Sequence, residues 1–201
     1  MQAVRYVALG DSYTIGTSVS ASERWPNQLA ARIPGVDLIA NLGVNGFTSG
    51  DVIDIELPQL PALQPELLTL LIGVNDVVQR VPEASYRGNV SDILDALAGA
   101  VGAGHVLVVT TPDYTVTPAG ADYGDPATQA AAIRRNNAIN TELASARGIA
   151  VVDIYDLSLR AATDRSLVAS DGLHPSGGQY ALWVEQIGPA IEGLIAGAAA
   201  G

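Results

Sequence analysis

Apolar positions along the chain fall into two patterns: short continuous runs and longer stretches with helical spacing. The short runs cover residues 5–9, 36–41, 67–72, 106–110 and 149–152. The first, third and fourth are almost continuous in Val, Leu, Ile, Ala and Thr, which is typical of strands buried on both faces. Helical spacing between and after these runs predicts helices over residues 25–33, 49–60, 82–101, 125–147 and 176–195. Pro58 is expected to end or kink the second helix.

The alternation of strands and helices predicts the architecture. Strand–helix–strand units place their strands parallel in one sheet and cover both faces with helices. We therefore expect an α/β fold, a three-layer α/β/α sandwich with a five-stranded parallel sheet, formed by residues 1–201 as a single domain. Ligands bind such sheets at the carboxyl ends of the strands. The long irregular segment 111–126 is expected to build or cover a site there.

Charge and composition exclude several classes of partner. The formal net charge is −11, and all ten basic residues are arginines, of which only Arg134 and Arg135 are adjacent. No basic patch is therefore available to bind nucleic acid or an anionic membrane surface. Residues 187–201 are too short and too weakly apolar to span a bilayer, and the first apolar run is too short for a signal peptide. We expect a cytoplasmic protein, and a secreted one if a signal peptide has been removed.

Few residues are available as metal ligands. The chain has no cysteine, two histidines and no calcium-loop motif, so we expect neither a metal nor a cofactor. His105 precedes a predicted strand and therefore belongs to the amino edge of the sheet, away from the expected site.

His174 and Ser12 belong to the opposite edge. His174 lies in S-D-G-L-H-P, just before the last predicted helix, with Asp171 three residues ahead of it. At this spacing a carboxylate can contact the imidazole, orient it and stabilise its charged form. Ser12 directly follows the first predicted strand in L-G-D-S-Y. An isolated G-D-S is best interpreted as a serine that caps a turn, so the interpretation depends on the neighbouring loops.

Two further loops offer hydrogen-bond donors at the same edge. Asn75, in L-I-G-V-N-D, follows the third strand, and Gly46, in G-V-N-G-F, follows the second. A tetrahedral intermediate of acyl transfer needs two or three donors around its oxyanion. A single glycine or asparagine in a loop usually does no more than form a turn. Together, the four loops contain the parts of an acyl-transfer site in the order Ser, Gly, Asn and Asp/His.

At these residues the sequence resembles the SGNH (GDSL) hydrolase family, and the resemblance spans nearly the whole chain, from Gly10 to His174. It includes S-E-R-W-P after the serine loop, whereas G-D-S-Y replaces the more usual G-D-S-L. The resemblance implies a flavodoxin-like SGNH hydrolase fold and a serine esterase. Because the chain has little beyond the minimal domain from which to build a lid, we expect small to medium acyl esters as substrates. It implies Ser12 as nucleophile, His174 as base, Asp171 as its partner, and an oxyanion hole of Ser12, Gly46 and Asn75.

The substrate and two other functions stay open at this point. Position alone predicts that the substrate pocket is lined by Tyr13, Val74, Val77 and Tyr114. Lipids, thioesters, aryl esters and acetylated sugars all remain candidate substrates, and the oligomeric state is undetermined. One alternative is a flavin- or nucleotide-binding flavodoxin-like module, because S-Y-T-I-G-T loosely resembles hydroxyl-rich phosphate loops. The other is an acyltransferase that uses the same triad.

Overall fold

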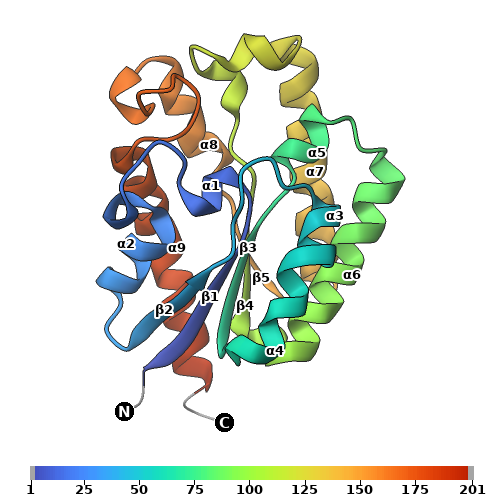
Figure 1. Ribbon diagram of the computed structural model, residues 1–201, viewed down its shortest axis with the longest axis vertical. Helices are drawn as coiled ribbons and strands as arrows, with labels where there is room; N and C mark the ends of the chain where they lie inside the picture. The colour runs from blue at the N-terminus through green and yellow to red at the C-terminus, as the bar shows by residue number, and fades with distance from the viewer. Residues whose placement is uncertain (1–2, 199–201) are drawn as a thin grey trace.

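The centre of the molecule is a five-stranded parallel sheet (Figure 1). The computed structural model describes residues 3–198. The strand order is β2-β1-β3-β4-β5, the flavodoxin-like order. The strands are β1 (Val4–Gly10), β2 (Val36–Asn41), β3 (Leu67–Leu71), β4 (Val106–Val109) and β5 (Ala150–Val152). The prediction of five parallel strands in an α/β fold is confirmed.

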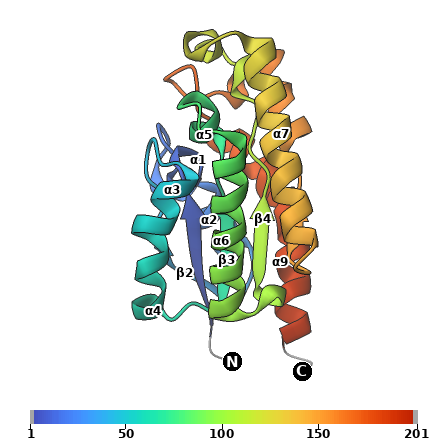
Figure 2. The same cartoon turned by 90° about the vertical axis from the view of Figure 1, so that its right-hand side faces the viewer.

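Helices cover both faces of this sheet and complete a three-layer sandwich (Figures 1 and 2). One face carries α2 (Trp25–Arg32) and α9 (Gly177–Ala198), and the other carries α6 (Glu83–Val101) and α7 (Pro126–Ser145). The shorter helices are α1 (Ser12–Ile15), α3 (Ser49–Asp51), α4 (Leu60–Leu63), α5 (Val74–Val78) and α8 (Tyr155–Ser158). Among residues 3–198, no helix combines the length and apolarity that crossing a membrane requires.

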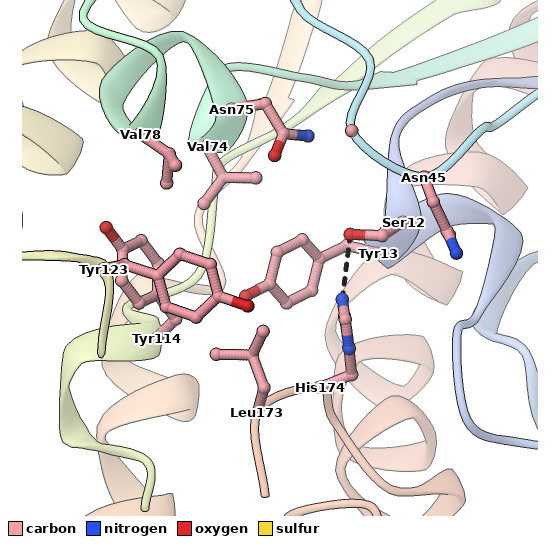
Figure 3. Close-up of a pocket in the computed structure, with 11 residues that line it drawn as sticks. Ser12, Tyr13, Asn45, Val74, Asn75, Val78, Tyr114, Tyr123, Leu173 and His174 are labelled. Carbon is pink, nitrogen blue, oxygen red and sulfur yellow. Dashed lines mark hydrogen bonds between the residues drawn. The ribbon is translucent and has the colours of Figure 1, made fainter. Parts of the chain in front are cut away.

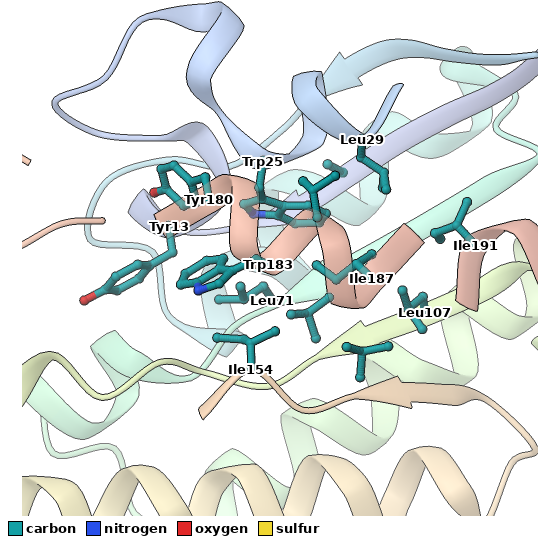
Figure 4. Packing of buried hydrophobic residues seen from close by; sticks show 14 of the residues in the cluster. Tyr13, Trp25, Leu29, Leu71, Leu107, Ile154, Tyr180, Trp183, Ile187 and Ile191 are labelled. Carbon is teal, nitrogen blue, oxygen red and sulfur yellow. The ribbon is translucent and has the colours of Figure 1, made fainter. Parts of the chain in front are cut away.

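Strand side chains alternate between two hydrophobic clusters, one on each face. In β1, Tyr6 and Ala8 belong to the cluster under α2 and α9, whereas Val7 and Leu9 belong to the cluster under α6 and α7. This two-residue period is the geometry of a strand. All four residues are fully buried, which explains why the sequence reads as a continuous apolar run. Figure 4 shows the first cluster, in which Trp183 packs between Tyr13 and the core of the sheet.

The segment predicted as a helix over residues 49–60 is longer and less regular. After α3 the chain forms a π-helical turn (Val52–Glu56), a 3-10 turn (Leu57–Gln59) and then α4, which ends at Leu63. The predicted end at residue 60 is wrong. Pro58 lies in the first turn of the 3-10 segment, at the point where the π-helical bonding pattern ends, because proline has no N–H to continue it. π-helical turns occur often near functional sites, and this one carries the buried carboxyl of Glu56.

The turn from β1 into α1 requires glycine. Gly10 has a φ of +148°, and a Cβ at this position would lie 2.2 Å from the carbonyl oxygen of Leu71 and 2.4 Å from Oγ1 of Thr14. Only a residue without a side chain tolerates both conditions. The close approach of β1 and β3 at this point lets α1 start directly at the carboxyl edge of the sheet, with Ser12 as its first residue.

Candidate active site

Ser12 is held at the start of α1 by the residue before it. Asp11 is the N-cap of this helix, and its Oδ1 accepts a hydrogen bond of 2.9 Å from the Tyr13 backbone N–H. Asp and Ser are preferred at such positions because their oxygens satisfy N–H groups that the helix leaves free. The cap is therefore Asp11 and not Ser12, and the serine hydroxyl remains available to a partner outside the turn.

That partner is His174, which lies between Ser12 and Asp171. Nε2 of His174 is 3.0 Å from Oγ of Ser12, and Nδ1 is 2.7 Å from Oδ2 of Asp171 (Figure 3 draws the first contact). Residues from the two ends of the chain, 162 positions apart, thus meet within hydrogen-bond distance. The D-x-x-H spacing brings the carboxylate and the ring together as the sequence predicted.

The ionisation of Asp171 decides the direction of these hydrogen bonds. Partial burial alone would raise its pKa, but hydrogen bonds from Ser18, Leu173 and His174 outweigh burial and hold the pKa of this carboxyl well below its usual range. An ionised carboxylate only accepts, so Nδ1 of His174 carries the hydrogen of that contact. In the neutral ring Nε2 is then an acceptor, able to take the proton of the Ser12 hydroxyl.

Gly46, on the loop after β2, and Asn75, in the first turn of α5, lie beside Ser12 in the pocket lining. Nδ2 of Asn75 donates to the carbonyl oxygen of Phe47 at 2.9 Å, and Nε2 of Gln79 donates to the carbonyl oxygen of Gly46 at 2.8 Å. These bonds attach the Gly46 loop to α5. An amide nitrogen has two hydrogens, so the second N–H of Asn75 is left for another acceptor. Within residues 3–198, the backbone N–H groups of Ser12 and Gly46 donate to no protein acceptor.

A pocket of about 250 Å³ opens at Ser12. It is lined by Ser12, Tyr13, Asn45, Gly46, Val74, Asn75, Val78, Tyr114, Tyr123, Leu173 and His174. Figure 3 shows the apolar and aromatic side chains on one side of the Ser12–His174 pair and Asn45 on the other. An apolar wall beside a few converging polar groups is the usual composition of a small-molecule site.

Three of the four residues predicted to line the pocket do so, namely Tyr13, Val74 and Tyr114. Val77 does not, and Val78 takes its place in the lining, although both valines pack against the hydrophobic cluster under α9. Val74 and Val78 are four residues apart on α5 and so share a face of the helix. This short helix is not among the helices predicted from the sequence. The 3.6-residue period of a helix that starts at Val74 is the signal that favours Val78.

The other additions to the site carry weaker sequence signals. Tyr123 belongs to the 111–126 segment, which was expected to contribute, whereas Asn45 and Leu173 are direct neighbours of predicted site residues. Ser18 was missed, and its hydroxyl contacts Asp171. Among the described residues no group of three or more His, Cys, Asp or Glu side chains is arranged to bind a metal ion.

Comparison with protein families agrees with this geometry. The model of the GDSL-like lipase/acylhydrolase family matches residues 8–182. The chain belongs to this family. The match covers the segments that carry Ser12, Gly46, Asn75 and His174. Family membership makes the protein an ester-hydrolysing enzyme.

Solved structures of this GDSL-family fold superpose over most of the chain. A lipolytic protein of the G-D-S-L family from Veillonella parvula has a TM-score of 0.75 at 18% identity, covering 92% of this chain and 96% of its own. A lipase/acylhydrolase from Enterococcus faecalis has a TM-score of 0.75 at 22% identity, and the superposition covers 94% of this chain and 96% of that one. An acetylxylan esterase from Geobacillus stearothermophilus has a TM-score of 0.73 at 16% identity, and the superposition covers 94% of each chain. Curated protein sequences contain no significant match.

Two fully buried carboxyls, those of Asp11 and Glu56, lie next to the turn that carries Ser12 in this GDSL-family enzyme. Oε2 of Glu56 accepts the Gly10 backbone N–H at 3.0 Å. Oδ2 of Asp11 and Oε1 of Glu56 have no hydrogen-bond partner among the described residues. Burial raises the pKa of Asp11 to about 8 and that of Glu56 to about 9, and repulsion by neighbouring carboxyls adds to both. Both groups are therefore mostly protonated at neutral pH.

The proton on Glu56 predicts a pH dependence of stability. Between the pKa of an unfolded glutamate and the folded value of about 9, the folded protein holds a proton that the unfolded chain releases. Its free energy of unfolding therefore falls as pH rises through this window, by ~1.4 kcal/mol per pH unit for one full proton. Glu56→Gln removes this contribution, so urea unfolding between pH 5 and pH 9 should give a flatter curve than for the native chain.

Glu185→Gln is the matched control, because Glu185 is exposed on α9. We expect its stability curve to run parallel to that of the native chain. A Glu56→Gln curve that also runs parallel would mean that Glu56 exchanges no proton on unfolding in this range.

Proposed function

We propose that the enzyme hydrolyses small to medium acyl esters through a covalent acyl-enzyme intermediate, with Ser12 as nucleophile, His174 as general base and Asp171 as its partner. The observation that carries this proposal is the position of the His174 ring, 3.0 Å from Oγ of Ser12 on one side and 2.7 Å from Oδ2 of Asp171 on the other. A base within this distance of a hydroxyl, itself oriented by a third group, is the arrangement that activates serine for attack.

The reaction begins when Oγ of Ser12 attacks the ester carbonyl carbon and its proton moves to Nε2 of His174. Asp171 stabilises the imidazolium that forms, without taking the proton itself. The former carbonyl oxygen, now negative, accepts hydrogen bonds from the N–H groups of Ser12 and Gly46 and from the Asn75 amide. Donors fixed in place before the charge develops stabilise it without reorganisation.

Collapse of this intermediate releases the alcohol, which takes the proton from Nε2 of His174. Ser12 is left as an acyl ester. A water molecule then gives a proton to the same nitrogen, attacks the acyl carbon and releases the acid by the reverse sequence. Every proton transfer uses a nitrogen already within reach of Ser12, so no cofactor enters the proposed cycle.

The pocket supports an apolar acyl group of limited length. Val74, Val78 and Leu173 form its apolar wall together with Tyr114 and Tyr123. The two tyrosine rings meet edge to face with centroids 5.7 Å apart. Tyr114 is buried and Tyr123 is 42% exposed, so Tyr123 ends this wall at the protein surface. A volume of about 250 Å³ is at the small end for ligand sites, which favours short and medium chains.

The proposed function is tested by combining turnover with covalent labelling. The native chain is assayed on p-nitrophenyl esters from acetate to laurate, and a fluorophosphonate probe is added to a second sample. We expect hydrolysis that is most efficient below laurate, and one probe per chain on the peptide that contains Ser12, located by mass spectrometry. The Ser12→Ala variant should take up no probe. Labelling at another serine, or hydrolysis by an unlabelled form, would refute the assignment.

The same assay separates hydrolysis from acyl transfer. With glycerol or methanol present in excess, a hydrolase releases mainly the free acid, whereas an acyltransferase releases mainly the new ester. We expect free acid to dominate, because the pocket is open to solvent at Asn45 and Gly46, both exposed.

A further inference from the structure

The carboxylate of Asp171 accepts four hydrogen bonds. Three come from its own turn: Oδ1 accepts the backbone N–H groups of Leu173 (2.9 Å) and His174 (3.0 Å), and Oδ2 accepts Nδ1 of His174 (2.7 Å). The fourth donor is the hydroxyl of Ser18, 2.6 Å from Oδ2 and 153 positions away in the sequence. Ser18 follows Ser12 by six residues, so this bond joins the loop of the proposed nucleophile to the loop of the proposed base.

The backbone of Ser18 adds a second, independent observation. Its φ is +68°, and Gln64 and Arg80 are the other non-glycine residues with positive φ in the described part of the chain. Gln64 is the C-cap of α4, and Arg80 closes the turn after α5, positions where this conformation is common. Ser18 lies two residues beyond Gly16, the C-cap of α1. Non-glycine residues held in this conformation cluster at active sites, where their surroundings maintain the strain.

We infer that Ser18 is a positioning residue for the proposed reaction, whose hydroxyl holds the Asp171 carboxylate against Nδ1 of His174. The inference rests on the proposed function. Ser18, Asp171, His174 and Ser12 form a closed ring, made of three hydrogen bonds and the chain from residue 12 to residue 18. In this closed arrangement the side chain of His174 cannot rotate away from Ser12 without also breaking its hydrogen bond to Asp171.

Removing the hydroxyl has two opposing effects on His174. The side chain of Asp171 is 29% exposed, so without Ser18 it has room to rotate toward solvent, and fewer His174 rings stay aligned with Ser12. In the aligned state Oδ2 loses a competing donor, becomes a stronger acceptor for Nδ1–H and stabilises the imidazolium more. The first effect lowers kcat, and the second raises the pH at which the base gains its proton.

Four other ionisable groups lie near the hydrogen-bonded ring. Glu23 lies between Ser20 and Gly177, and hydrogen bonds from Ser20 hold the pKa of this carboxyl below its usual range. Tyr13 of α1 packs on the His174 ring with centroids 5.4 Å apart, and Tyr180 of α9 lies close enough to sense the charges of Asp171 and Arg24. Burial raises the pKa of both tyrosines well above the usual range. Asp11, with a pKa of about 8, ionises on the alkaline side. A shift of the acidic limb of the activity profile in a Ser18 variant is therefore not expected to come from these groups.

The first test compares Ser18→Gly with Ser20→Gly. Glycine tolerates positive φ, so Ser18→Gly removes the hydroxyl without adding strain. Ser20 lies in the same exposed loop, and its hydroxyl bonds to Oε2 of Glu23 at 2.6 Å instead.

For Ser18→Gly we expect kcat to fall about tenfold with little change in KM, the loss typical of a partly exposed hydrogen bond to a charged group. The midpoint of the acidic limb of kcat/KM should rise by about half a pH unit. Ser20→Gly should change neither.

The second test uses proton NMR and does not depend on turnover. The proton on Nδ1 of His174 should give a low-field resonance, identified by its loss in Asp171→Asn. We expect it to move downfield in Ser18→Gly and to stay in place in Ser20→Gly.

A fall in kcat with an unmoved midpoint and an unmoved resonance would overturn the inference, since it would show that Ser18 only supports its loop. An unchanged kcat would overturn it as well. If the native chain hydrolyses no ester but the resonance still moves, the proposed function fails, whereas the link from Ser18 through Asp171 to His174 is supported.

Discussion

Replacing Ser12 or His174 with alanine is expected to lower kcat for p-nitrophenyl ester hydrolysis by about 10⁴- to 10⁶-fold, with KM changed far less. Without the Ser12 hydroxyl no acyl-enzyme forms. Without the His174 ring, whose Nε2 is 3.0 Å from that hydroxyl, no group removes its proton. The two residues act in one step, so the double variant should be about as active as either single variant. This lack of additivity separates a catalytic unit from two independent structural defects.

His105→Ala is the matched control for the histidine. It is the other histidine of the chain and lies before β4, at the amino edge of the sheet, with Nδ1 2.7 Å from the carbonyl oxygen of Val101. We expect native kcat in this variant. Activity that persists in His174→Ala and disappears in His105→Ala would show that the base has been assigned to the wrong end of the sheet.

Replacing Asn75 with alanine is expected to lower kcat by about 100- to 1000-fold, the usual cost of losing one oxyanion donor. The amide hydrogen that the Phe47 carbonyl does not use is the one proposed to stabilise the oxyanion. Because that charge exists only near the transition state, KM should change much less than kcat. The measurement is steady-state kinetics on the best ester of the chain-length series.

Asn75→Ala also removes the hydrogen bond to Phe47, so the structural loss needs its own control. Ser49→Ala breaks a neighbouring bond between the segment after β2 and α5, from Oγ of Ser49 to Oδ1 of Asp76 at 2.6 Å, and removes no donor from the pocket. We expect Ser49→Ala to lower the urea midpoint while kcat stays within about tenfold of native. An equal loss of kcat in both variants would show that loop attachment, and not oxyanion stabilisation, explains the role of Asn75.

The strands and long helices were predictable because their signals are local. A strand buried on both faces needs an apolar residue at every position, and a helix against a sheet needs one every three or four residues. The 82–101 prediction differs from α6 by a single residue. The segment after Ser49 was predicted less well, since a π-helical turn before Pro58 depends on what packs around it and not on its own period.

The sequence by itself determined the order of the elements, the edge of the sheet where ligands bind, and the residues Ser12, Asn75 and His174 that stand there. Each follows from neighbours in the chain and from the rule that parallel strands share one carboxyl edge. Tertiary structure alone decided which distant hydroxyl completes the hydrogen bonds of Asp171, and why Asp11 and Glu56 hold their protons near neutral pH. These properties depend on burial and on contacts up to 153 residues apart, and no local pattern encodes either, because desolvation and distance are set by the whole fold.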